Sequence, residues 1–244
     1  MRSNELILYR DFKHKNILDL ASLIMSGNDA EAKEHMTAFT GDLVELAASH
    51  GYTGNLWQAY LTYLIANNEN AFSRSCEMTG MPKGTIGKAA LHDLSIFRQM
   101  FGTDIREFDR ISGTDLAALL TDYTGEHDRT RIFNKRIRDS ILGLRDELAG
   151  ALSDEEFAEK VASFYAHFGV GKFGLHKAFR VEHGDAGVQI VPITNILHVY
   201  LEDLVGYESA KKRLVDNTEA FLAGRPCNNC LLFGDAGTGK SSSI

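Results

Sequence analysis

The sequence has few prolines, few cysteines and no net positive charge. Its three prolines stand at positions 82, 192 and 226, so helix is little interrupted over roughly the first 170 residues. Three cysteines are too few for a disulfide framework and favour a reduced, cytoplasmic protein. A net charge of −7 argues against a general nucleic-acid-binding surface.

Long apolar runs are also missing. No run reaches the roughly 18 residues needed to cross a bilayer, and residues 1–5 do not lead into the apolar segment and small-residue cleavage site of a secretory signal. The 244 residues are 44% hydrophobic and 24% charged, which is ordinary for a soluble protein. We therefore expect one large or two small domains with a sizeable core, and no membrane partner.

Apolar residues recur every three or four positions through most of the chain, which predicts amphipathic helices. At the start of the last such helix, Ser153 and Glu156 have the spacing of a capping box, and Gly169 suits its end. The stripes are Ala32, Met36, Phe39, Leu43 and Leu46; Trp57, Tyr60, Leu61 and Leu64; Ala90, Leu94, Phe97 and Phe101; Leu116, Leu119, Leu120 and Tyr123; Phe133, Ile137, Ile141, Leu144 and Leu148; and Phe157, Val161, Phe164 and Phe168.

These stripes need partners, so residues 1–168 are predicted to form one mainly α N-terminal domain. The pattern then changes. Residues 179–181 and 188–191 are rich in β-formers and flank a turn-like segment with two glycines, which predicts a β-hairpin within a linker at 169–195.

A third region, residues 196–244, has the first elements of an α/β domain. Gly206 precedes a predicted helix at 207–223, which Gly224 and Pro226 end. Residues 229–233 form a short apolar run of strand length that leads directly into Gly234.

The pattern G-x-x-x-x-G-K-[ST] follows this run, with Gly239, Lys240 and Ser241 in its second half. Phosphate oxygens need several backbone N–H groups at close range, which a glycine-rich backbone allows. Lys240 would bring charge to the β and γ phosphates and is the candidate catalytic residue, and the Ser241 hydroxyl would ligate Mg²⁺. The predicted nucleotide contacts are Gly234, Asp235, Ala236, Gly237, Thr238, Gly239, Lys240, Ser241 and Ser242.

Residues 201–208, 217–224 and 228–243 together resemble the bacterial AAA+ ATP-binding family known as domain-of-unknown-function family 815. The resemblance is closest over 196–244 and less specific upstream. It implies an α/β P-loop ATPase domain with ATP and Mg²⁺ as ligands. It also implies that Val205, Gly206 and Tyr207, in the segment 204–207, lie near the adenine.

The same resemblance places the acidic Walker B strand, the sensor and the arginine finger after Ile244, so the chain is expected to be the front part of a longer ATPase. Without the helix after Ser241, the loop would lack a helix dipole and part of its N–H donors. We therefore expect these 244 residues alone to bind ATP weakly or not at all. For the complete protein, we also consider a protein partner on the helical domain and assembly into a homo-oligomer.

Three weaker patterns are interpreted structurally. Cys227 and Cys230 lack two further zinc ligands nearby and are expected to be small residues where a strand starts. The G-x-G-x-x-G match at 169–174 follows a helix rather than a strand, which indicates flexible linkage. Arg131, Lys135 and Arg138 are expected to form a solvated helix face, because Asp128 and Asp139 dilute their charge.

Two alternatives to the AAA+ interpretation stay open. The loop is compatible with a P-loop kinase or another nucleotide-dependent enzyme, and the downstream sequence would distinguish these. In a non-enzymatic alternative, the helical domain is an interaction module.

Overall fold

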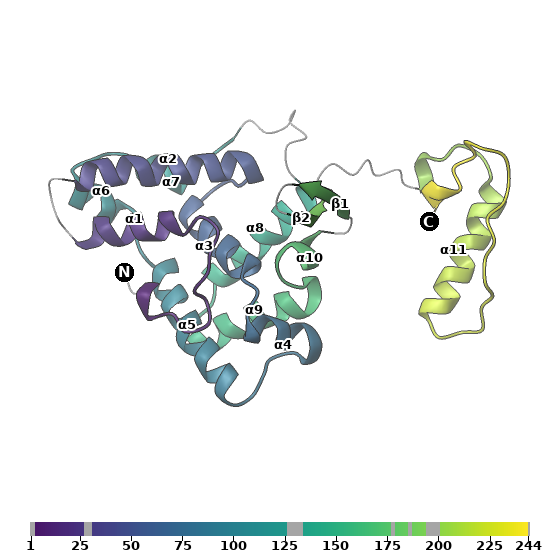
Figure 1. Cartoon of the computed structure of the whole chain (residues 1–244), viewed down its shortest axis with the longest axis horizontal. Helices are drawn as coiled ribbons and strands as arrows, with labels where there is room; N and C mark the ends of the chain where they lie inside the picture. Colours follow the sequence, from purple (N-terminus) through teal and green to yellow (C-terminus); the bar gives the residue numbers. More distant parts are fainter. Residues whose placement is uncertain are drawn as a thin grey trace. The chain divides into compact units, whose positions relative to one another are not determined.

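The computed structural model describes residues 3–26, 31–125, 134–176, 179–184, 187–193 and 201–243. The chain divides into two compact units, Met1–Asn195 and Ile196–Ile244. The first unit is mainly helical and carries one antiparallel hairpin, as the sequence predicted (Figure 1). None of the described helices combines the length and apolar character that crossing a bilayer requires.

The first unit contains ten described α-helices, a short 3-10 helix at Ser3–Glu5 and two strands. The helices are α1 Lys15–Ser26, α2 Ala32–His50, α3 Leu56–Asn67, α4 Ala71–Thr79, α5 Thr85–Phe101, α6 Arg106–Ser112, α7 Ala118–Thr121, α8 Lys135–Ala149, α9 Asp154–Phe168 and α10 Gly171–Leu175, and the strands are β1 Phe179–Gly184 and β2 Gly187–Pro192.

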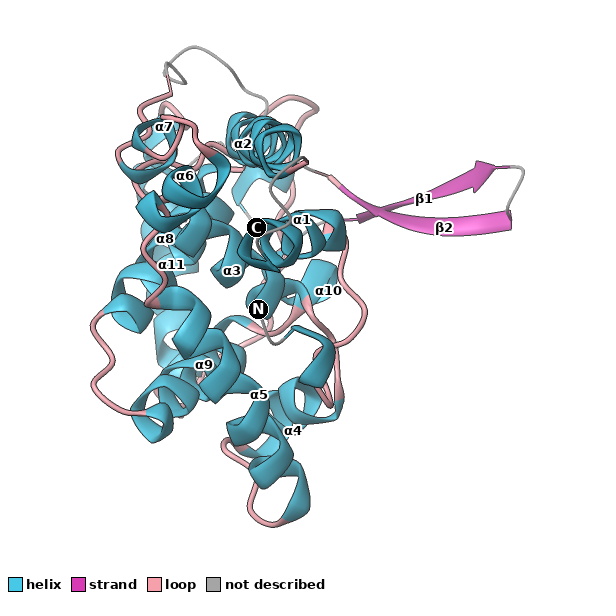
Figure 2. Ribbon diagram, turned by 90° about the vertical axis from the view of Figure 1, so that its left-hand side faces the viewer, coloured by secondary structure: helices cyan, strands magenta, loops and turns pink. Residues whose placement is uncertain are grey.

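Helix α3 is the centre of this unit. All of its residues except Gln58 and Asn67 are buried, and α2, α5, α7, α8, α9 and α10 pack against it (Figure 2). A helix that is apolar on every side needs neighbours on every side. Trp57 illustrates the packing: its ring is fully buried, and its indole N–H donates to the Met100 carbonyl at 2.8 Å.

The predicted stripes supply this core. The buried members of five stripes include Phe39 on α2, Leu94 on α5, Leu120 on α7, Ile141 on α8 and Phe157 on α9. Leu119 is an exception at 55% exposure, because the short helix α7 buries only Leu120. Phe133 lies outside the described residues.

The capping box at the start of α9 forms only in part. Ser153 Oγ accepts from the Glu156 N–H at 3.1 Å, as predicted. The Glu156 carboxylate instead accepts from the Leu152 N–H, at 2.8 Å, so the predicted return bond to Ser153 is wrong by one residue. Gly169 ends the helix with a φ of +76°, which favours glycine.

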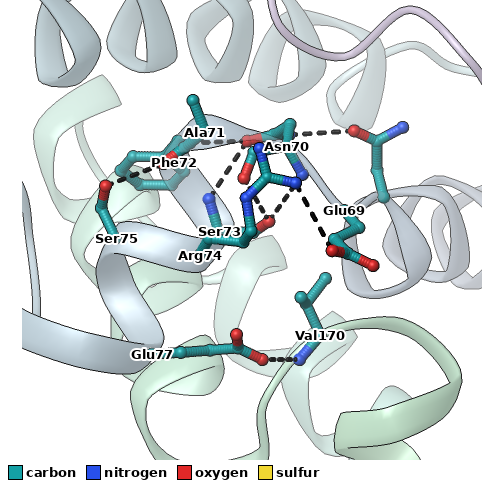
Figure 3. Close-up of polar contacts among 10 residues, drawn as sticks. Glu69, Asn70, Ala71, Phe72, Ser73, Arg74, Ser75, Glu77 and Val170 are labelled. Carbon is teal, nitrogen blue, oxygen red and sulfur yellow. Dashed lines mark hydrogen bonds and ion pairs between the residues drawn. The ribbon is translucent and has the colours of Figure 1, made fainter.

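The G-x-G-x-x-G segment is a tight helical turn, which corrects the expectation of flexible linkage. Residues Gly171–Leu175 form α10. A Cβ on Gly174 would lie 2.3 Å from the carbonyl carbon of Gly169, so the two glycines allow a close backbone approach that no other residue permits. The Glu77 carboxylate accepts from the Val170 N–H at 2.6 Å and fixes this turn to α4 (Figure 3).

The N-terminal segment is fixed by one buried carboxylate on α5. Asp93 is fully buried and accepts from the N–H groups of Ile7, Leu8 and Tyr9 at 2.7 to 3.1 Å. His92 Nδ1 lies 3.0 Å from Oδ1 of the Asp93 carboxylate. Three successive N–H groups therefore depend on a single side chain more than eighty residues away.

We expect Asp93→Ala to lower the free energy of unfolding by roughly 2–4 kcal/mol, because it leaves several buried N–H groups without an acceptor. Urea unfolding followed by Trp57 fluorescence measures the change, since Trp57 is the sole tryptophan and lies in the core. Asp19→Ala, at an exposed position on α1, is the control. Equal stability of the two variants would contradict the role of Asp93.

Candidate functional site

The candidate site lies in the second unit, which is described for residues 201–243. Its one α-helix there is α11, Glu208–Leu222, within one residue of the predicted range at each end. Gly206 and Tyr207 turn the chain into this helix with φ values of +88° and +59°. The Tyr207 carbonyl then accepts from the Ala210 and Lys211 N–H groups, each at 2.9 Å.

Lys211 ties the start of α11 to the segment before it. Its ammonium group donates to the Leu204 carbonyl at 2.8 Å and forms an ion pair with Glu208, also at 2.8 Å. These bonds hold the turn at Gly206 and Tyr207 against the first helical turn. Sequence reasoning missed Lys211, although its spacing of four from Tyr207 places both on one helix face.

The predicted strand at 229–233 is absent, and the segment is irregular. The described part of this unit contains no strand with which residues 229–233 could pair. A strand needs such a neighbour to bond its N–H and C=O groups. Leu231 and Phe233 are 84% and 86% exposed, which fits an apolar segment without a cover. Of the elements predicted for this region, the described residues therefore contain the helix and the loop but not the strand.

Asn217 on α11 holds the start of this segment. Its Nδ2 donates to the Asn228 carbonyl at 2.8 Å, and its Oδ1 accepts from the Asn228 N–H at 3.0 Å. Asn217 Nδ2 also lies 3.3 Å from Cys230 Sγ. Cys227 and Cys230 are both exposed free thiols. One side chain thus satisfies both backbone groups of Asn228 and positions the approach to the glycine-rich loop.

The glycine-rich loop folds around the ammonium group of its own lysine. Lys240 Nζ donates to the carbonyls of Gly234 and Asp235 at 2.9 and 2.5 Å, and lies 3.3 Å from Thr238 Oγ1. Gly234, Gly237 and Gly239 all have positive φ, at +145°, +79° and +79°. Ser241–Ser243 continue as a turn of 3-10 helix.

The N–H groups of the loop are uncommitted. Within residues 201–243, those of residues 235–241 donate to no acceptor of the protein. The carbonyl groups of Gly234 and Asp235 are instead bonded by Lys240, and that of Gly239 by the Ser243 hydroxyl at 2.8 Å. The loop therefore presents donors and satisfies acceptors internally, which is the arrangement that an anion requires.

Leu204 packs directly on this loop. A Cβ on Gly239 would lie 3.1 Å from Leu204 Cδ2, so the Leu204 side chain lies against this glycine, whose φ of +79° favours the absence of a side chain. Val205, one of the predicted base contacts, is 94% exposed. The structure therefore brings Leu204 to the loop and leaves the Val205 side chain in solvent.

A pocket of about 460 Å³ lies between α11 and the loop. Tyr207 lines it, together with Gly234, Asp235, Thr238 and Lys240, so these five predicted site residues meet there. The lining does not include Val205, Gly206, Ala236, Gly237, Gly239, Ser241 or Ser242. Sequence reasoning missed Ala210, Lys211, Leu214, Leu231, Leu232, Phe233 and Ser243, which complete the lining.

A larger groove of about 820 Å³ in the first unit has a different character. It lies between α8 and α9 and mixes Arg136 with Asp139 and Glu147 over Leu144 and Phe164. On the same face, Arg138 forms an ion pair with Asp139 at 2.7 Å. Arg131 lies outside the described residues. The mixed charge gives this groove no net preference for an anion.

The described residues show no cluster of three His, Cys, Asp or Glu side chains able to hold a metal ion. The third cysteine, Cys76, is buried on α4. Burial raises the pKa of its thiol to about 11, so it stays protonated near neutral pH and is a packing residue.

The comparisons with known proteins fall on this same region. Residues 174–244 match the family model described as Protein of unknown function (DUF815). The matched part begins at the end of α10 and includes the hairpin, α11 and the glycine-rich loop. No curated protein and no solved structure matches the chain.

We expect Asn217→Ala to release the segment that precedes the loop. Hydrogen exchange of the Asn228 amide should become about fivefold to tenfold faster, because its acceptor is lost. Exchange mass spectrometry on peptides covering 226–233 measures this, with the exposed Asp216→Ala as control. An unchanged rate would show that Asn217 does not hold the segment.

Proposed function

We propose that this chain binds the triphosphate of ATP with residues 234–242, as an ATPase of the AAA+ type. The observation that carries the proposal is the loop itself. It combines uncommitted N–H groups at residues 235–241 with one ammonium group inside the same turn. The match of residues 174–244 to the DUF815 family agrees with the resemblance from which the proposal began.

The donor set of the loop fits a phosphate group. Backbone N–H groups and an ammonium are donors only, so they suit an acceptor that carries negative charge. The positive φ values of Gly237 and Gly239 support successive N–H groups that converge on one point. A side chain at Gly239 would be strained by the φ of +79° and would press on Leu204 Cδ2, 3.1 Å from its Cβ.

Lys240 would exchange partners when phosphate arrives. Its ammonium group now bonds the carbonyls of Gly234 and Asp235, which are neutral acceptors. A phosphate oxygen is a charged acceptor, and such bonds are about twice as strong as bonds to neutral groups. The lysine is thus held beside the place where charge is needed and released by the ligand itself.

The remaining roles follow from position. The Ser241 hydroxyl, in the first turn after the loop, would bind Mg²⁺, which neutralises phosphate charge. Tyr207 would approach the base from the other side of the pocket, with Leu214 and Leu232 as apolar lining. The helical unit would then recognise a partner or regulate the nucleotide site. The free thiols favour a cytoplasmic location.

Lys240→Ala tests the proposal most directly. We expect it to weaken ATP binding by about tenfold to a hundredfold, since one charge-assisted bond is lost. Amide NMR spectra of the chain, titrated with Mg-ATP, detect weak binding and locate it on residues 235–241. Lys212→Ala, on the exposed side of α11, is the control. Shifts confined to the groove between α8 and α9 would contradict the assignment.

Ser241→Ala tests the binding of Mg²⁺ separately from the binding of the nucleotide. We expect this variant to bind ATP in the absence of metal as the parent chain does, and to lose the gain in affinity that Mg²⁺ provides. The same titration with and without Mg²⁺ measures both values, and Ser209→Ala on α11 is the matched control. A Mg²⁺ gain equal to that of the parent would exclude Ser241 as a ligand.

A further inference from the structure

The hairpin β1–β2 has an exposed apolar face. The register pairs Val181 with Ile190 and His183 with Val188, so these four side chains share one face. Val181 and Val188 are 61% and 66% exposed. No described helix packs extensively on either strand, and Figure 2 shows the hairpin extending away from the helices. An isolated two-stranded hairpin is marginally stable, and an added strand would stabilise it.

Among the described residues, no strand other than β2 pairs with β1, so its outer edge has no strand beside it there. Pro192 pairs with Phe179 and has no N–H, so this pair cannot exchange two hydrogen bonds. The alternation of antiparallel pairing then directs the N–H and C=O groups of Phe179, Val181 and His183 away from β2. Within the described residues, Val181 has no backbone bond outside the hairpin. Such an edge is a template for another strand.

The charged residues of β1 indicate which strand would pair with its outer edge. Arg180 and Glu182 lie on the opposite face from Val181, two residues apart, and form an exposed ion pair at 2.6 Å. We propose that β1 pairs antiparallel with β1 of a second copy of this chain, around a two-fold axis at Val181. Arg180 of each copy then faces Glu182 of the other, and the two hairpins join into one four-stranded sheet.

Only this register pairs apolar side chains on one face of the sheet and opposite charges on the other face. A shift by one residue places the apolar face of one copy beside the charged face of the other. A shift by two residues in one direction places Arg180 of one copy opposite Arg180 of the other, and a shift by two in the other direction does the same for Glu182. Like charges directly opposite each other are destabilising. Strand β2 has no charged residue to select a register, since its polar-face positions are Gln189 and Val191.

The two-fold arrangement joins the apolar faces into one surface. Val181 meets its own equivalent at the axis, and Val188 and Ile190 of both copies lie on the same side. The interface is isologous, so it closes as a dimer and does not extend into a fibre. A single strand pair is smaller than a standard protein interface, so the dimer dissociates on dilution. The ion pairs contribute register more than affinity.

Charge reversal in the full chain tests this dimer by sedimentation velocity over a wide range of concentration. The parent chain is expected to associate as a dimer. Arg180→Glu and Glu182→Arg, each alone, place like charges opposite each other and weaken self-association by about tenfold or more. Both positions are exposed, so the fold is retained, which circular dichroism checks.

Two further samples make the test specific. The double variant R180E/E182R restores opposite charges across the axis and should dimerise like the parent chain. An equimolar mixture of the two single variants should associate with each other more strongly than either does with itself. A parent chain that stays monomeric, single variants that dimerise unchanged, or a mixture that fails to associate would each overturn the proposal.

Discussion

The constraint on which the helical unit depends is the burial of α3, which leaves only Gln58 and Asn67 partly exposed. A central helix that exposes neither side to water has to be surrounded, and α2, α5, α8 and α9 each supply an apolar stripe for that purpose. The buried polar groups at this centre are satisfied by the helices themselves. The Trp57 indole bonds the end of α5, and the Tyr165 hydroxyl bonds the carbonyl of Ile65 at 2.6 Å. Packing and hydrogen bonding therefore specify the same arrangement of neighbours.

The second unit is ordered in a different way, by polar side chains that form hydrogen bonds with its irregular backbone. Asn217 bonds Asn228, Lys211 bonds Leu204, and Lys240 bonds Gly234, so three polar side chains order the chain in a unit whose described residues form no sheet. The loop remains concave with few apolar contacts, and its exposed N–H groups are the feature that an anion would recognise. The match to the DUF815 family covers this unit, the hairpin and the end of α10, and begins after α1–α9.

Sequence reasoning worked best where one short-range pattern decides the structure. The 3.6-residue stripes, the presence of a hairpin after the helices, and the limits of α11 all depend on local spacing. Sequence reasoning failed where the structure of a segment depends on which other residues bond or pair with it. The apolar run at 229–233 reads as a strand, but the described unit has no strand to pair with it. Glu156 capped Leu152 instead of Ser153, a choice between adjacent N–H groups that spacing cannot make. Lys211 was missed because its role depends on how the turn at Tyr207 folds back. Leu204 belongs to the segment expected near the adenine, and its contact with Gly239 of the loop could not be read from spacing.

The carboxylate of Asp93 has a consequence for how this protein is made. Ile7, Leu8 and Tyr9 leave the ribosome long before their acceptor does, so this part of the chain has no native hydrogen-bond partner until α5 has been synthesised. Residues 7–9 are thus locked in place only after the chain as far as α5 has been made. Closing so long a loop has an entropic cost that a compact, already collapsed set of helices reduces.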